Sequence, residues 1–342
     1  MHPDLLRWLR EDAHWHELPQ AQRLGMAWRS FWASWNRRLS DAQLTQAPPL
    51  AAPIFIVGPW RSGTTVMHEL LTAATGLPTP QTWQCMNASS FQLLPAPPDT
   101  VRRARPMDGL EISARSPQED EFALLCLGVD SAYRAFLQPH RCGELTRALD
   151  PSYWLASADA WLPRFERFLQ GVLATEQRHG QRLLLKSPNH SFRLPALLRR
   201  FPNAQVVWML RDAPSVLHSN RKMWRQMIEE HHISSVPWSA DRVDAFLGDA
   251  LRSCAEVLRS PELQSLPATR WTTCWQQDLA ERPGEAVERV LHRLGLSVEH
   301  PDALQTAVGR VAQGRIDHYD AGIPAAAAQG VEALDAAQQA FR

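Results

Sequence analysis

Short runs of apolar residues, each followed by a polar turn and then by a helical pattern, recur along the chain. The runs lie at residues 54–57, 183–185 and 206–210. Apolar runs of this length, bounded by turn residues, predict buried β-strands. Because strands and helices alternate, we expect parallel βαβ units and an α/β fold, with a central parallel sheet flanked by helices. Ligands of such sheets bind beyond the carboxyl ends of the strands.

The apolar pattern also divides the chain into three expected parts. Residues 1–50 carry apolar side chains, many of them tryptophan, at helical spacing, and predict an N-terminal helical extension that ends in a proline-rich break. Residues 51–325 form the expected main domain, in which 119–180 and 215–300 look mainly helical. Residues 326–342 are expected to form a C-terminal tail or helix.

A glycine-containing loop follows the first predicted strand. Gly58 and Gly63 are spaced as in a phosphate-binding loop and precede a predicted helix, whose amino terminus favours an anion. Thr64 stands where nucleoside triphosphatases need a lysine, and Arg61 supplies the cation instead. The loop therefore favours a phosphate-like group without a metal ion. A tight strand-to-helix turn with an incidental arginine is the alternative.

The other two predicted strands also end in candidate chemistry. Arg211 follows one strand, and Ser219 lies two helical turns farther on, so the two can hold a second phosphate. The alternative is a surface ion pair between Arg211 and its neighbour Asp212. Lys186 follows three leucines, and His190 is a candidate proton acceptor four residues later. A lysine that extends to solvent and a core histidine are the alternatives there.

Composition and charge narrow the function classes. The chain is 44% hydrophobic and 21% charged, as expected of a folded globular protein. Basic and acidic residues number 36 each, so the formal net charge is zero and no overall field attracts nucleic acid or an anionic membrane. Five cysteines without a CxxC pair argue against a metal cage or disulfide framework. We expect a cytoplasmic protein with no membrane span and no nucleic-acid partner.

Taken together, the segments PWRSGTT, LLLKSPNH and RDAPSVLHS resemble sulfotransferases that use 3′-phosphoadenosine 5′-phosphosulfate (PAPS) as donor. The likeness is to bacterial sulfotransferases and, more distantly, to protein-tyrosine sulfotransferases, and it extends over about residues 53–325. It implies the P-loop-like sulfotransferase fold and two donor subsites. The residues that would cradle the 5′-phosphosulfate are Arg61, Ser62, Gly63, Thr64 and Thr65. Arg211 and Ser219 would hold the 3′-phosphate.

The resemblance also implies catalytic roles. Lys186 matches a lysine that the family places near the transferring sulfuryl group, whereas His190 falls close to the family's catalytic histidine but not on it. Gln84 stands where relatives carry a glutamate base, and an amide cannot take a proton. Glu119 and Glu121, with Asp120 between them, are the other candidate bases. The alternative for this acidic run is a favourable first helical turn.

The expected activity is transfer of the sulfuryl group of PAPS to a hydroxyl group, with no metal required. The acceptor stays open among small molecules, sugars, lipids and peptidyl tyrosine. Two other classes compete with this interpretation. A P-loop-type kinase or nucleoside triphosphatase would depend on Mg²⁺ and ATP. A non-catalytic nucleotide-binding protein would keep the donor pocket without the chemistry.

Overall fold

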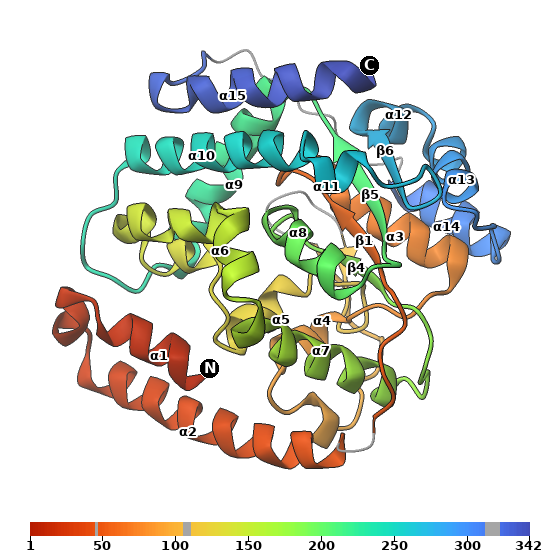
Figure 1. Cartoon of the computed structure of the whole chain (residues 1–342). Coiled ribbons are helices and arrows are strands. Elements are labelled where there is room, and N and C mark those ends of the chain that lie inside the picture. Colours follow the sequence, from red (N-terminus) through yellow and green to blue (C-terminus); the bar gives the residue numbers. More distant parts are fainter. Residues whose placement is uncertain (45–46, 105–110, 312–321) are drawn as a thin grey trace.

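A four-stranded parallel sheet forms the centre of the molecule (Figure 1). The computed structural model describes residues 1–44, 47–104, 111–311 and 322–342. In spatial order the strands are β4 (Leu184–Lys186), β1 (Ile54–Val57), β5 (Gln205–Leu210) and β6 (Trp271–Trp275), and all neighbouring pairs run parallel. The predicted α/β class with a central parallel sheet is confirmed.

The three predicted strands occupy adjacent positions in this sheet. Ile56 of β1 is aligned with Lys186 of β4 on one side and with Val207 of β5 on the other. These strands are buried along their whole length, which explains why they are continuous apolar runs in the sequence. β6 is not among the predicted strands, because its burial alternates and its sequence, WTTCW, mixes polar and apolar residues.

Helices cover both faces of the sheet. Ile54 and Ile56 pack into a cluster with one set of helices, and Phe55 and Val57 pack into a larger cluster with another set. This division follows from the alternation of side chains along a strand. The first set is α3 (Thr64–Thr75), α13 (Pro283–Arg293) and α14 (Pro301–Val311). The second set includes α8 (His190–Arg200), α9 (Ala213–His231) and α10 (Ala240–Leu258).

Further elements complete the part of the chain between the first strand and α15. They are α4 (Thr82–Met86), η2 (Phe91–Leu93), β2 (Arg103–Ala104), β3 (Glu111–Ile112), α5 (Glu121–Cys126), η3 (Ala132–Phe136), η4 (Pro139–Leu149), α6 (Pro151–Ala156), α7 (Ala158–Thr175), α11 (Pro261–Gln264) and α12 (Gln276–Glu281). The regions predicted to be mainly helical are helical apart from β6 and connecting loops. The predicted main domain, residues 51–325, includes residues 105–110 and 312–321, which lie outside the described residues.

The N-terminal segment forms α1 (Pro3–Arg10), η1 (Ala13–Glu17) and α2 (Gln20–Gln43). Leu5, Leu6 and Leu9 of α1 are buried in the larger core cluster. Asp4 forms an ion pair with Arg164 of α7, with 2.7 Å between Oδ2 and Nη2. α1 is therefore anchored on the body of the molecule, and α2 runs along its lower edge in Figure 1.

The C-terminal segment forms α15 (Ala325–Gln338) and η5 (Gln339–Phe341), and α15 lies along α10 (Figure 1). Two glycines let these helices approach closely. A Cβ atom on Gly330 would lie 2.0 Å from the carbonyl oxygen of Gly248. At the end of α15, the Gln338 side chain accepts the backbone N–H of Arg211 at 3.0 Å. The C-terminal helix thus contacts the predicted donor site.

None of the helices in the described ranges has the length and apolar character needed to cross a membrane. The five cysteines are free thiols.

Candidate active site

The loop after β1 has the backbone geometry of a tight cradle. Gly58 and Gly63 have φ angles of 134° and 92°, and Arg61 has 67°, all in the left-handed half of the map. A Cβ atom on Gly58 would lie 2.6 Å from the Met209 carbonyl oxygen, so this position requires glycine. Ser191 of α8 pins the loop, because its hydroxyl accepts the Gly58 N–H at 2.9 Å and donates to the Gly58 carbonyl at 3.0 Å.

The predicted cradle residues have different places in this loop. Ser62 is fully buried, and its hydroxyl donates to the Pro59 carbonyl at 2.7 Å, so the side chain closes the loop on itself. Thr64 and Thr65 begin α3, whose amino terminus adds backbone N–H groups and a favourable dipole for an anion. Thr64 is buried and Thr65 is partly exposed.

The two predicted phosphate subsites adjoin each other. The Arg61 guanidinium donates from Nε to the Ser219 hydroxyl at 3.1 Å. Arg211 donates from Nη1 to the backbone carbonyl of Arg61 at 2.7 Å. The loop after β1 and the start of α9 are thereby joined at the carboxyl ends of neighbouring strands. Two guanidinium groups at the carboxyl end of the sheet form a local positive site in a chain of zero net charge.

A buried ion pair lies at the end of β4. Lys186 Nζ is 3.1 Å from Oε2 of Glu119, and both side chains are buried. The Glu119 carboxylate also accepts hydrogen bonds at Oε1, from the Tyr133 hydroxyl at 2.9 Å and from the Ser187 hydroxyl at 3.3 Å. Burial and the charge of Glu119 raise the pKa of Tyr133 well above its usual value, so this phenol stays a donor. Three donors therefore converge on one carboxylate.

The two residues that follow Glu119 form further buried pairs. Asp120 Oδ2 lies 3.0 Å from Nε2 of His190, and both side chains have no exposed surface. Glu121 accepts two hydrogen bonds from the guanidinium of Arg193, one of them at 3.0 Å. The consecutive acidic residues 119, 120 and 121 thus pair in order with the basic residues 186, 190 and 193.

The structure separates the predicted catalytic residues by their surroundings. His190 lies between the rings of Phe55 and Phe165, at centroid distances of 5.7 Å and 5.2 Å. Its imidazole, like Glu121, is enclosed in the core, whereas Lys186 and Glu119 keep 3% and 6% of their surfaces exposed. Lys186 and Glu119 are therefore the members of the set that lie nearest to solvent.

Two polar side chains near the site have structural partners. Gln84 caps α4 by accepting the Gln81 N–H at 2.8 Å, and its amide donates to Thr175 at 3.0 Å. His68 of α3 contacts the Thr79 hydroxyl through Nε2 at 2.6 Å. Burial, reinforced by the positive charge of Lys186, lowers the pKa of His68 to about 3. His68 is therefore neutral beside the site.

Sequence reasoning missed three residues of this arrangement: Tyr133, Ser187 and Arg193. Arg193 carried a signal, because it lies three positions after His190 and therefore on the same side of the helix that follows β4. Tyr133 carried none, since nothing local to residue 133 indicates contact with Glu119. Within the described ranges, no group of three or more histidine, cysteine or acidic side chains is arranged to bind a metal ion.

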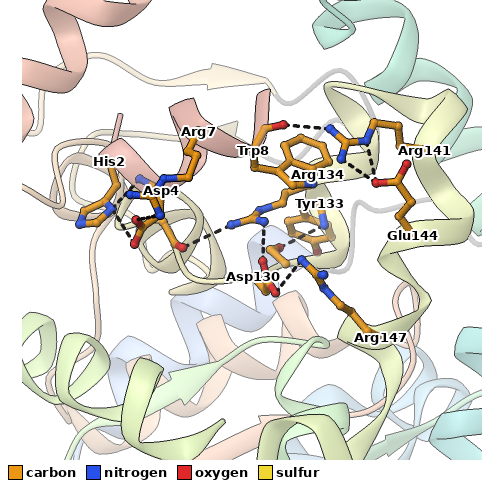
Figure 2. Close-up of polar contacts among 12 residues, drawn as sticks. His2, Asp4, Arg7, Trp8, Asp130, Tyr133, Arg134, Arg141, Glu144 and Arg147 are labelled. Carbon is orange, nitrogen blue, oxygen red and sulfur yellow. Dashed lines mark hydrogen bonds and ion pairs between the residues drawn. The ribbon is translucent and has the colours of Figure 1, made fainter. Parts of the chain in front are cut away.

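A second polar cluster is centred on Asp130, and Figure 2 shows its contacts with Arg134 and Arg147 beside Trp8 of α1. The Asp130 carbonyl accepts a hydrogen bond from Arg193 at 2.9 Å. Its carboxylate pairs with Arg134 and, at 3.1 Å, with Arg147. The guanidinium of Arg134 in turn lies over the Trp8 ring, 5.2 Å from its centroid. A chain of ion pairs, one hydrogen bond to a backbone carbonyl and one cation–π contact thus connects Glu121 with α1, beside a cavity of about 270 Å³.

The chain is similar in sequence to known proteins. The sequence model of the sulfotransferase family matches residues 53–300. The chain is 29% identical over 297 residues to omega-hydroxy-beta-dihydromenaquinone-9 sulfotransferase Stf3 of Mycobacterium bovis, and equally so to Stf3 of Mycobacterium tuberculosis. Each alignment covers 84% of this chain and 72% of the relative.

Two solved structures have a similar fold. Sulfotransferase STF1 of Mycobacterium tuberculosis aligns with a TM-score of 0.60 and 21% identity, over 98% of this chain and 90% of that one. Sulfotransferase STF9 of Mycobacterium avium aligns with a TM-score of 0.61 and 20% identity, over 88% and 80%. At these identities the likeness supports the predicted fold.

Proposed function

The chain belongs to the sulfotransferase family, and from that premise we propose that it transfers the sulfuryl group of PAPS to a hydroxyl group of an apolar acceptor. One observation carries the donor assignment. Arg61 and Ser219 lie 158 positions apart in the sequence and belong to the motifs of two different predicted phosphate subsites. In the structure they are hydrogen-bonded to each other. A ligand with phosphate-like groups at two positions would bridge such paired sites.

The residues present fit that donor. The left-handed glycines of the loop leave room for an anion to approach the backbone, and Arg61, Thr64 and Thr65 are the side chains that would hold the phosphosulfate end. Arg211 and Ser219 would hold the 3′-phosphate. Thr64 in place of a lysine disfavours the rival nucleoside triphosphatase, which needs an ammonium group there.

Glu119 and Lys186 are the proposed reacting pair. The donor supplies an activated sulfuryl group, which passes to the acceptor oxygen as the bond from sulfur to the bridging phosphate oxygen breaks, and the departing phosphate keeps that electron pair. Glu119 takes the proton of the acceptor hydroxyl at a carboxylate oxygen. The Lys186 ammonium, 3.1 Å from that carboxylate, stabilises the negative charge that develops on the leaving oxygen.

His190 and Glu121 are proposed as positioning residues. Both are enclosed, and each orients a segment of the site through a buried pair, His190 through Asp120 and Glu121 through Arg193. Because residues 119–121 are consecutive, these pairs fix the backbone that carries Glu119. Their loss is expected to lower kcat indirectly and to lower stability directly.

For the acceptor, we propose a hydroxyl group on a lipid-like molecule. The support is the relative that is 29% identical over 84% of this chain and is named for a hydroxylated dihydromenaquinone. Assays should compare hydroxylated quinols with sugars and tyrosine peptides, using labelled donor. Preferred labelling of the quinol supports this acceptor class, and preferred labelling of a sugar or a peptide contradicts it.

Donor binding is tested by isothermal titration with 3′-phosphoadenosine 5′-phosphate. Replacing either Arg211 or Arg61 with alanine should weaken binding about tenfold or more, because each substitution removes a charge-assisted contact. Arg252→Ala is the matched control, since this half-exposed arginine pairs with Asp249 on α10. Tighter binding of ATP in the presence of Mg²⁺ than of the bisphosphate would overturn the assignment in favour of a triphosphatase.

An assay of the slow hydrolysis of labelled donor distinguishes a catalytic protein from one that only binds the donor. The wild type should release sulfate, and Lys186→Ala should lower that rate about 100-fold or more while it leaves the affinity for the bisphosphate within a few-fold. Binding without any release of sulfate or transfer to a hydroxyl would support the non-catalytic rival instead.

A further inference from the structure

The outer face of α2 carries a stripe of exposed large apolar side chains, the α2 stripe. Its members recur at intervals of three and four residues and therefore lie on one side of the helix. They are Leu24, Trp28, Phe31, Trp32, Trp35 and Leu39, with 42% to 63% of each residue exposed. Isolated exposed apolar residues are ordinary, but a contiguous stripe of this size marks an interaction surface.

The orientation of α2 is the reverse of that expected for a helix that only packs on a core. Its buried residues are Met26, Ser30, Ala33 and Ser40. Three of these four side chains are small, and two of them are polar. The outer face is the more apolar of the two. Hydrophobic burial within this chain therefore does not account for the stripe.

The aromatic rings of the stripe support one another. Trp28 stacks on Phe31 with 6.3 Å between ring centroids and meets Trp32 edge-on at 5.6 Å. These contacts hold the rings in a continuous surface along α2 without removing them from solvent. Tryptophan is the side chain that favours the boundary between water and lipid, because its ring is apolar and its indole N–H is polar.

Charge on α2 distinguishes between possible occupants. The helix carries Arg23, Arg29, Arg37 and Arg38, and its one acidic residue is Asp41. Asp41 is already engaged, by Arg37 at 3.6 Å and by Arg167 of α7 at 3.7 Å. Arg29 and Arg38 are exposed. A second copy of the chain on this face would bring like charges together, whereas an anionic surface would complement them.

We propose that the α2 stripe docks the protein on the surface of an anionic lipid bilayer. α2 lies in the plane of the interface, with the aromatic rings inserted at the level of the headgroups and Arg29 and Arg38 paired with lipid phosphates. This is attachment to one leaflet and not a membrane span, in keeping with the helix properties described above. The formal net charge of the whole chain is zero, so net charge alone does not indicate this local basic and aromatic surface.

Vesicle flotation tests the proposal without donor or acceptor, so its result is independent of the proposed function. The wild type should float with vesicles of phosphatidylcholine that contain roughly one third phosphatidylglycerol, and less with phosphatidylcholine alone. Replacing Trp28, Trp32 and Trp35 together with serine should lower the partition coefficient about 100-fold. Arg29→Gln and Arg38→Gln should each lower it about fivefold on the anionic vesicles only.

The control replaces exposed apolar residues elsewhere, Val101→Ser and Leu155→Ser, and should leave flotation unchanged. Thermal unfolding of every variant verifies that the fold is retained, and the two single arginine variants keep the test valid if the triple variant does not fold. Absence of wild-type flotation, or equal flotation of the triple variant, would overturn the proposal. So would a wild-type dimer that the triple substitution dissociates while no protein floats, because the occupant would then be a second copy.

Discussion

At the residue scale, the proposed reaction depends on the carboxylate of Glu119. Glu119→Gln keeps the size of the side chain and a hydrogen-bonding oxygen but cannot accept a proton. We expect kcat to fall by about 10²–10⁴-fold, with the affinity for the bisphosphate product within a few-fold of wild type. Initial rates and calorimetric titration measure the two quantities. Glu285→Gln, on the exposed face of α13, is the control, and an unchanged kcat in the Glu119 variant would contradict the assignment.

His68 makes stability depend on pH. Its pKa is about 3 in the folded protein because of burial and the charge of Lys186, against 6.5 when unfolded. The unfolded chain therefore binds the proton first, and the free energy of unfolding falls as pH decreases from about 6.5 toward 3. From about pH 7.5 to about pH 5 the loss should be about 2 kcal/mol.

Urea unfolding of the wild type and His68→Gln at both pH values measures this contribution. Glutamine can still contact Thr79 but does not titrate, so the variant should lose about 2 kcal/mol less on acidification. His2, whose pKa is also lowered, to about 4, is present in both proteins and cancels in the comparison. An identical decrease in both proteins would show that His68 does not titrate as described.

Individual residues differ in how far sequence predicts their contacts. Gly58, Gly63 and Arg61 could be placed because a strand, a loop and a helix are contiguous there. The contact between Lys186 and Glu119 could not be predicted, because 67 residues separate them and only the fold brings the end of β4 to the segment before α5. For His190 the sequence predicted a candidate proton acceptor but not its buried partner, because Asp120 lies 70 residues earlier in the chain.

At the scale of elements, the packing of α15 on α10 is expected to control the donor site. Gly330→Ala would place a methyl group 2.0 Å from the Gly248 carbonyl and force the helices apart. We expect the free energy of unfolding to fall by about 1–3 kcal/mol. The affinity for the bisphosphate should fall several-fold, because Gln338 of α15 accepts the backbone N–H of Arg211. Urea unfolding and calorimetric titration measure these effects.

Gly309→Ala is the matched control for that substitution. Gly309 lies on the exposed side of α14, and nothing stands within 4 Å of a Cβ atom there. Alanine should raise the free energy of unfolding by about 0.5–1 kcal/mol at such a position. If Gly330→Ala behaved like this control, close packing of α15 would not be required.

Elements were predictable where burial is uniform. β1, β4 and β5 are buried along their length and stand out as apolar runs, whereas β6 is buried at alternate residues and does not. The helical spacing of α2 was equally plain. The sequence did not predict which side of α2 faces the core, because the side with more apolar residues faces outward.

At the scale of the whole molecule, the predicted N-terminal helical extension, residues 1–50, is expected to unfold together with the rest of the chain. The structure gives a physical reason to expect cooperative unfolding. Leu5, Leu6 and Leu9 share one core cluster with Phe55 of β1. Trp8 is 5% exposed and lies under two guanidinium groups, including that of Arg141 at 4.5 Å (Figure 2).

Trp8→Ala tests this coupling. We expect a loss of about 3–5 kcal/mol in the free energy of unfolding, since a large buried ring is removed. Circular dichroism and tryptophan fluorescence should follow a single urea transition at a lower midpoint, because α1 and the sheet unfold together. Trp28→Ala replaces a tryptophan that is 63% exposed and should change stability by less than about 0.5 kcal/mol. A separate early transition in Trp8→Ala, with the main one unshifted, would instead make the N-terminal helices an independent unit.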